Sequence, residues 1–200
     1  MDIRLKNARI SYAKGLWKKS AAVEGAEPKY NCDFIIIAGK TVVEKKVEGK
    51  GWVPTTIKAV EQAVALEAFK GNQEKATEWF NDLTRQQRSI RDGNKQRAGD
   101  EVRDGYKDNL YVHVTSTTRM PVLNAQAQEV ASEDDSPVYS GCYVTARVSI
   151  YANTKPQTRG VFASLQGTQY TGEGDAFGGN RRAAREDFEA ADGASAEDYA

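Results

Sequence analysis

The segment 138–152, VYSGCYVTARVSIYA, alternates core-type and surface-type side chains along its length. Successive side chains of a β-strand point to opposite faces, so the pattern predicts a strand with one buried face. The side chains expected in a core are those of Cys142, Val144, Ala146, Val148 and Ile150. The opposite face carries Tyr139, Gly141, Tyr143, Thr145, Arg147, Ser149 and Tyr151. Any fold of this chain must therefore place three tyrosines and an arginine on the outer side of this strand.

Four further segments have the β-branched and aromatic composition of strands: 3–12, 30–38, 109–117 and 159–169. Between them, apolar residues recur at helical spacing over 55–70 and 73–91, with Gly71 and Asn72 as a stop and restart. Five strands with one helical insertion predict a mainly β protein, a five-stranded, partly open OB-type barrel. An antiparallel sandwich of similar length would give the same pattern, and this alternative stays open.

Charge divides the chain into two unequal parts. Residues 186–200 contain no Lys or Arg, and the rest of the chain has 22 Asp and Glu against 28 Lys and Arg, a balance of about +6. We therefore expect a folded domain over 1–170, with its helical insertion at about 55–91, and a flexible tail over 171–200. The tail is either solubilising or an internal mimic of a polyanion that competes for a cationic groove. Its carboxylates are Glu186, Asp187, Glu189, Asp192, Glu197 and Asp198.

Aromatic and basic residues recur away from the expected core. Such a combination is typical of a groove for single-stranded nucleic acid, where rings stack on bases and cations neutralise phosphates. The alternative is that a helix or loop covers these faces and the rings are outer-layer packing, with Trp17 closing one end of the barrel. The candidate DNA-binding residues are Trp17, Lys18, Lys19, Tyr111, Tyr139, Tyr143, Arg147, Tyr151, Lys155, Arg159 and Phe162.

The sequence offers little for catalysis. One histidine, His113, and two distant cysteines, Cys32 and Cys142, do not make a zinc site of the usual composition. The acidic run 133–135 lies in a Ser/Asp-rich stretch typical of a solvated turn, and neither a P-loop nor a dinucleotide fingerprint is present. We expect no enzymatic activity, no cofactor and no bound metal.

The N-terminus lacks the apolar core of a signal peptide, and no stretch approaches the roughly 20 apolar residues of a membrane span. A cytoplasmic location without membrane contact is expected, in the host bacterium if a phage encodes the chain. In that compartment the two cysteines are expected to be free thiols packed within strands.

Several short motifs in order resemble one protein family. They are NARISY (7–12) with Leu16-Trp17, PKY (28–30) leading into FIII (34–37), Asp92-Gly93, SGCYVTARVSIY (140–151) and GVFASLQ (160–166). Together they are similar to the phage single-stranded DNA-binding proteins grouped as the DUF2815 family, over most of residues 3–175. The resemblance implies an OB fold, continuous coating of phage single-stranded DNA during replication and recombination, and no enzymatic activity.

Proteins of this functional class in general often end in a flexible acidic tail, sometimes with a terminal aromatic, and here Tyr199 is the last residue but one. The resemblance therefore implies that the tail recruits phage or host replication proteins, and that copies can associate along DNA. Two other functions stay open: a mediator of strand annealing or recombination and, less favoured, a nuclease with carboxylate-bound metal. A structural virion protein is a further alternative, but it would not explain why the acidic residues of the tail are separated from the basic rest of the chain.

Overall fold

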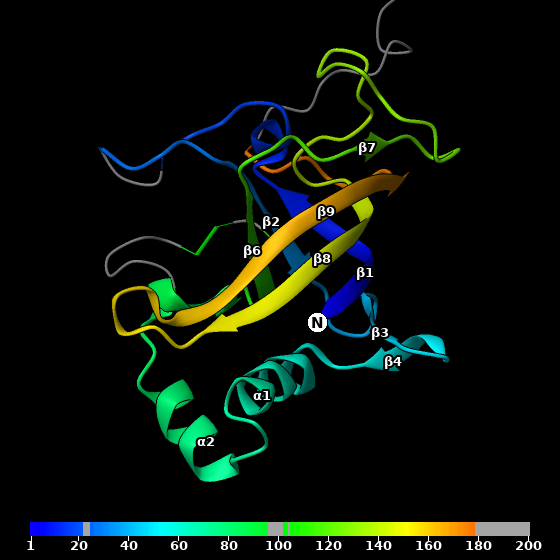
Figure 1. The fold of residues 1–200 in the computed structure, drawn as a ribbon. Helices are drawn as coiled ribbons and strands as arrows, with labels where there is room; N and C mark the ends of the chain where they lie inside the picture. Colours follow the sequence, from blue (N-terminus) through cyan, green and yellow to red (C-terminus); the bar gives the residue numbers. More distant parts are fainter. Residues whose placement is uncertain (22–24, 96–101, 104, 179–200) are drawn as a thin grey trace, which may run out of the picture.

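The computed structural model describes residues 1–21, 25–95, 102–103 and 105–178. Strands dominate, and two α-helices interrupt them in the first half of the chain (Figure 1). The elements are β1 (Asp2–Ser11), η1 (Ala13–Leu16), β2 (Tyr30–Ile36), β3 (Val42–Val47), β4 (Gly51–Thr55), α1 (Ile57–Ala68), α2 (Gln73–Asn81), η2 (Arg85–Gln87), β5 (Ile90–Asp92), β6 (Leu110–Ser116), β7 (Val122–Leu123), β8 (Tyr143–Asn153), η3 (Pro156–Thr158) and β9 (Gly160–Gly172).

Five strands pair in a ring, in the order β1, β2, β6, β9, β8 and back to β1. All these pairings are antiparallel except that of β6 with β9, which is parallel and has one register pair, Thr115 with Ser164. The ring is therefore held most weakly at this joint. Five strands in this order, closed by a short parallel contact, form the partly open OB-type barrel that the sequence predicts. The fold class is confirmed.

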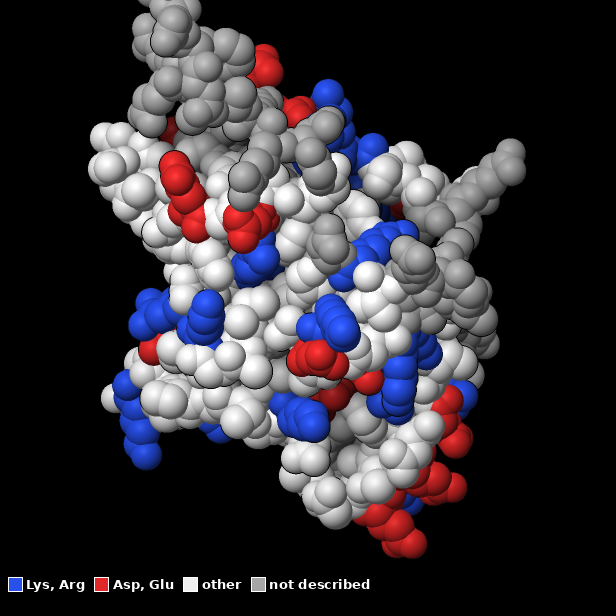
Figure 2. Space-filling view, turned by 180° about the vertical axis from the view of Figure 1, so that it is seen from behind, with Lys and Arg blue, Asp and Glu red and all other residues white. Residues whose placement is uncertain are grey.

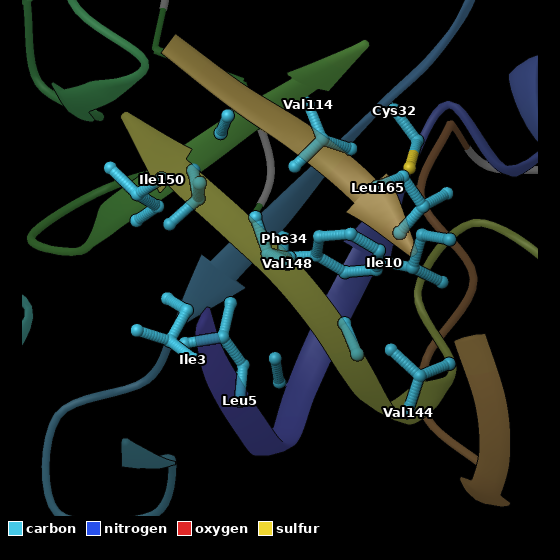
Figure 3. Packing of buried hydrophobic residues seen from close by; sticks show 14 of the residues in the cluster. Ile3, Leu5, Ile10, Cys32, Phe34, Val114, Val144, Val148, Ile150 and Leu165 are labelled. Carbon is cyan, nitrogen blue, oxygen red and sulfur yellow. The ribbon is translucent and has the colours of Figure 1, made fainter. Parts of the chain in front are cut away.

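Strand β1 contributes to three pairings because it bends. Its register with β8 shifts between Leu5 and Ala8, and Asn7 within the shift has φ 59°. Asparagine tolerates this left-handed conformation better than most residues, and a bulge here increases the local bend. Residues 3–6 pair with β3, whereas residues 9–11 pair with β2. The bend is visible between Leu5 and Ile10 in Figure 3.

The barrel core is built from alternate residues of the ring strands, as Figure 3 shows. Strand β8 contributes Val144, Ala146, Val148 and Ile150, each 0% exposed. Phe34 of β2 lies among them and is also fully buried. Burial of apolar surface at about 25 cal/mol per Å² makes this core the main source of stability. The core face expected for 138–152 is confirmed, because Cys142 and these four residues of β8 are all buried.

Helix α1 covers one end of the barrel with Ile57, Val60 and Val64, the apolar positions that the helical spacing predicts. Its first turn is capped by Thr56, whose hydroxyl accepts a hydrogen bond from the Ala59 amide at 3.2 Å. Gly71 at φ 87° and the Asn72 cap separate α1 from α2, as expected.

The structure differs from the sequence expectation in four places. The expected second helix, 73–91, ends at Asn81 and is followed by the short η2 and β5, because Thr84 and Gln87 form a capping box that begins a new turn. The unassigned segment 42–55 forms the hairpin of β3 and β4, which extends the sheet beside β1.

The other two differences concern the last two long strands. Strand β8 begins at Tyr143, so Tyr139 and Gly141 precede the strand on which they were expected. Strand β9 continues past residue 170 to Gly172, and Phe177 packs against the cluster of Ile35, Tyr106 and Tyr111.

Phe34→Ala tests the central position of this side chain in the core. Removing a fully buried phenylalanine is expected to lower the free energy of unfolding by about 3–5 kcal/mol, measured by urea denaturation. Val42→Ala is the matched control, because Val42 lies on the outer face of β3 with 47% of its surface exposed. An equal loss in the two variants would contradict the assignment of Phe34 to the core.

Candidate nucleic-acid interface

The outward side of β8 forms a continuous surface with parts of β1 and β9. We call this the β8 face and define it by Tyr143, Thr145, Arg147, Ser149 and Tyr151 of β8, with their cross-strand neighbours Arg4 and Arg9 of β1 and Phe162 of β9. Arg147 lies opposite Arg4, and Tyr151 lies opposite Phe162. The β8 face therefore brings together four of the predicted binding residues: Tyr143, Arg147, Tyr151 and Phe162.

One end of the β8 face combines an arginine with two rings. The Arg9 guanidinium carbon lies 5.7 Å from the centroid of the Tyr143 ring and 4.3 Å from that of Phe177. Arg9 also donates hydrogen bonds to the carbonyl oxygens of Gly141, at 2.9 Å, and of Asp175. Gly141 is required here, because its φ is 109° and a Cβ would lie 2.2 Å from the Asp175 oxygen. Arg9 and Phe177 were not predicted from the sequence.

The other end of the β8 face carries a pair of rings next to a basic turn. The ring centroids of Tyr151 and Phe162 are 5.9 Å apart, and 49% of the Tyr151 surface is exposed. The turn between β8 and β9 follows directly and contains the exposed Lys155 and the half-buried Arg159. Arg159 donates to the Asp82 carbonyl at 3.4 Å. The predicted residues Tyr151, Lys155, Arg159 and Phe162 thus lie together at one end of the sheet.

The loop between β1 and β2 carries the predicted Trp17, Lys18 and Lys19 at the opposite end of the barrel from the β8–β9 turn (Figure 1). Trp17 is half-buried against the core, with the Arg119 guanidinium 4.9 Å from its ring centroid. Lys18 Nζ lies 3.4 Å from Glu133, and Lys19 lies over the Tyr30 ring. An exposed ion pair contributes at most about 1 kcal/mol, so Glu133 does not prevent Lys18 from binding another anion.

Tyr139 and Tyr111 occupy different surroundings from the other predicted rings. Tyr139 is half-buried, and its hydroxyl donates to the Gly174 carbonyl at 2.9 Å, so it anchors the segment after β9. Tyr111 is only 4% exposed. Its ring meets Tyr106 edge to face at 4.9 Å, and its hydroxyl accepts from Arg85 at 2.6 Å. Tyr111 presents no accessible ring face and is not part of the surface that we propose below.

A buried polar network explains why the outer side of β2 and β6 is closed. The Asp33 carboxylate accepts from the Tyr106 hydroxyl at 2.7 Å and lies 2.7 Å from His113 Nδ1. Tyr106 is 3% exposed, and burial raises its pKa well above the usual range, with the neighbouring Asp33 charge adding to the effect. Tyr106 therefore stays a neutral donor and holds its segment over β2 and β6. On the β8 face, by contrast, Arg147 and Tyr151 are exposed.

A second group that the sequence analysis missed lies beside the β8 face, on the β3–β4 hairpin. The Trp52 ring centroid is 4.7 Å from the Arg4 guanidinium carbon and 5.6 Å from that of Arg147. Arg4 and Lys6 both bind the Glu44 carboxylate, at 2.6 and 3.0 Å. The signal for this hairpin was present in the sequence, since EGKG at 48–51 places two glycines, at φ 71° and 75°, where a tight turn needs them.

Figure 2 shows the face of the molecule opposite to that of Figure 1. Lys and Arg atoms lie in a band across its middle, with Asp and Glu atoms between them and toward the upper and lower margins. This face is therefore mixed in sign, and its positive charge is concentrated in that band. The predicted acidic residues Glu186, Asp187, Glu189, Asp192, Glu197 and Asp198 lie outside the described residues.

The remaining sequence predictions concern thiols, metals and membranes. Cys32 and Cys142 are free and buried, as expected, and burial raises the pKa of Cys142 to about 11. Among the described residues, no group of three His, Cys, Asp or Glu side chains is arranged to hold a metal ion. No helix in the described part of the chain is long and apolar enough to cross a membrane.

The Glu44 cluster makes stability depend on pH. Burial opposes ionisation of Glu44, but hydrogen bonds from Lys6 and Arg4 outweigh it and lower the pKa of the carboxyl. A lowered folded-state pKa contributes stability that is complete above the unfolded value, about 4.3, and is lost as the pH falls through the folded value. We expect Glu44→Gln to lower the free energy of unfolding at neutral pH and the difference from the parent chain to shrink in acid. Urea denaturation over a pH series measures it, and a difference that grows in acid would contradict the assignment.

Comparison with known proteins gives the same picture. A family model described as the ssDNA-binding protein of Enterobacter phage Enc34 matches residues 1–200. A putative protein p50 of Acyrthosiphon pisum secondary endosymbiont phage 1 is 29% identical over 196 residues, covering 94% of this chain and 93% of that protein.

Two solved structures of the Enc34 protein share the fold. The single-stranded DNA-binding protein of bacteriophage Enc34 in complex with ssDNA is 18% identical, with a TM-score of 0.58 over 88% of this chain and 89% of that one. The same protein in a second structure has a TM-score of 0.56 at 18% identity, over 93% of this chain and 88% of that one. With the family model matching the whole chain, the resemblance found in the sequence is confirmed: the chain belongs to the Enc34 ssDNA-binding protein family.

Proposed function

We propose that this protein binds single-stranded DNA without sequence specificity and coats it during phage DNA replication and recombination. The observation that carries the proposal is the β8 face, where Arg147 lies between Tyr143 and Tyr151 on the outward side of one strand. Membership of the Enc34 family supports it, because that family is named for ssDNA binding. Stacking and phosphate contacts hardly distinguish one base from another, so no sequence preference is expected.

The spacing along β8 suits an extended strand of nucleotides. Tyr143 and Tyr151 are eight residues apart, which corresponds to about 26 Å at the usual rise of a strand. Arg147 lies midway between them and, among the described residues, has no carboxylate partner. A single strand laid along β8 would thus meet a ring, a free guanidinium and a pair of rings in turn.

Basic loops extend the proposed surface at both ends. Lys155 and Arg159 follow the Tyr151 end, and the β1–β2 loop with Trp17, Lys18 and Lys19 follows the end of β1 that carries Arg9. Duplex DNA could be attracted by the same cations, but its bases are already stacked and paired. Stacking on Tyr143, Tyr151 and Phe162 is therefore the contribution that favours single strands.

Substitution of the rings on the β8 face tests this function. Tyr143→Ala and Tyr151→Ala are each expected to weaken binding of an oligo(dT) by about 1–3 kcal/mol, because each removes a stacking partner. Tyr151→Phe is the matched control and should retain most of the affinity, since the ring stays. Fluorescence anisotropy of a labelled oligonucleotide measures the affinity, with a duplex of equal length for comparison. Alanine variants that bind as tightly as the parent chain, or a parent chain that binds duplex and single strand equally, would refute the stacking surface.

We further propose that the acidic tail modulates DNA binding and recruits replication proteins. The support is its six carboxylates in residues 186–200, beside a body with an excess of about six positive charges. If the roughly twenty residues after Gly178 behave as a flexible chain, they span on the order of 25 Å, which suffices to reach basic loops of a small domain. The tail can then compete with phosphate for the basic loops until DNA displaces it.

Deletion of residues 186–200 is expected to raise single-strand affinity at low salt, and the gain should fall as salt screens the charges. A tail of unchanged length in which the six carboxylates are replaced by Asn and Gln is the control, and it should behave like the deletion. The measurement is the oligonucleotide titration repeated over a salt series. An affinity that is the same with and without the tail at low salt would rule out competition.

A further inference from the structure

The outer face of the β3–β4 hairpin carries Trp52, a ring that the surface described above leaves unused. We propose that Trp52 is a third stacking position for a base of the bound strand, and that Arg147 binds an adjacent phosphate. The inference rests on the proposed function and adds the β3–β4 hairpin to its binding surface.

Strand register fixes which side chains share this surface. Arg147, Arg4 and Glu44 lie in one row across β8, β1 and β3, as directly opposed residues. Lys46 lies two residues beyond Glu44 on the same side of β3 and faces Trp52 of β4. Side chains two residues apart on a strand point to the same face, so all five project outward from the sheet.

The Trp52 ring lies over the two arginines. Their guanidinium carbons are 4.7 and 5.6 Å from its centroid, close enough for cation–π attraction. The Trp52 side chain is only half-buried, so part of its surface stays open to solvent, where a base can stack on it.

Near Trp52, the cations of Arg4, Lys6, Lys46 and Arg147 outnumber the single carboxylate, that of Glu44. Glu44 is nearly buried, with its side chain 11% exposed, and binds both Arg4 and Lys6. Arg4 is thereby paired with a carboxylate and held against Trp52. Arg147 has no such partner among the described residues and is exposed, although it faces Arg4 directly. Opposed like charges are unfavourable in a sheet, and an anion bound to Arg147 relieves the repulsion.

The chemistry of this group fits a nucleotide better than a protein partner. A planar ring that is partly open to solvent binds a base, and a guanidinium without a carboxylate partner beside it binds a phosphate oxygen through paired N–H donors. The site is also continuous with the β8 face, since Arg147 belongs to both. Its occupant is therefore the same single strand that contacts Tyr143 and Tyr151.

The test isolates the emission of Trp52 in the full chain. The double variant Trp17→Phe with Trp79→Phe leaves Trp52 as the sole tryptophan. Addition of oligo(dT) is expected to quench its fluorescence, whereas an abasic oligomer of equal length, which has the same phosphates and no bases, should not. Anisotropy of the labelled oligonucleotide is recorded in the same titration. Quenching by the abasic oligomer to the same extent would show that no base stacks on the ring and would overturn the proposal.

Affinity provides a second readout. Trp52→Ala should weaken oligo(dT) binding at least about fivefold, as loss of one stacked base predicts, and Trp52→Phe should restore most of it. Arg147→Gln should reduce the slope of log affinity against log salt by about 0.7, the value for one phosphate contact on a single strand. Trp79→Phe, on α2, is the matched control and should bind like the parent chain.

The outcomes separate this inference from the proposed function. If oligo(dT) binds while Trp52 emission and the Trp52→Ala affinity stay unchanged, the hairpin site is refuted and the β8 face stands. If no oligonucleotide binds, both are refuted. If Trp52 emission responds to deletion of residues 186–200 and not to DNA, the surface binds the acidic tail and the proposal is overturned.

Discussion

The bend in β1 is the constraint on which the rest of the structure depends. A straight strand has two edges and pairs with two neighbours, whereas β1 pairs with β8, β3 and β2 because its register shifts around Asn7. The contact with β2 closes the ring of five strands, and the contact with β3 adds the hairpin that carries Trp52. The barrel core and the extended outer sheet thus originate from one strand.

This arrangement separates stability from the candidate binding surface. On β8, the residues that fill the barrel are fully buried, and those between them point outward beside Arg4, Arg9 and Phe162. A ring on the outer side can therefore change without opening a cavity in the core. The outward side of β2 and β6 is covered by Tyr106, which donates a hydrogen bond to Asp33 of β2. What remains accessible is a surface that one extended strand can follow.

The ring strands were predictable from alternation in β8 and from β-branched and aromatic composition in the others. The bounds of β1, β2, β6 and β9 were expected to within three residues, whereas β8 begins five residues later than expected. The β3–β4 hairpin was missed because its short strands are rich in Lys and Glu, and only Gly49 and Gly51 marked the turn. Tyr111 was expected off the core side, which is correct, but a strand pattern does not reveal that Tyr106, from a distant loop, covers it. The partners of Trp52 were likewise not predictable, since Arg4 and Arg147 come from two other strands, β1 and β8.

The central claim is that bases lie against the outer side of β8, and photo-crosslinking tests it directly. An oligonucleotide with 5-iodouracil in place of thymine is irradiated in complex with the full chain, and the crosslinked residues are identified by mass spectrometry. The account predicts crosslinks at Tyr143, Tyr151, Phe162 and Trp52. Crosslinks confined to Phe69 and Trp79 on the helical hairpin, or to residues of the β2–β6 side, would contradict it.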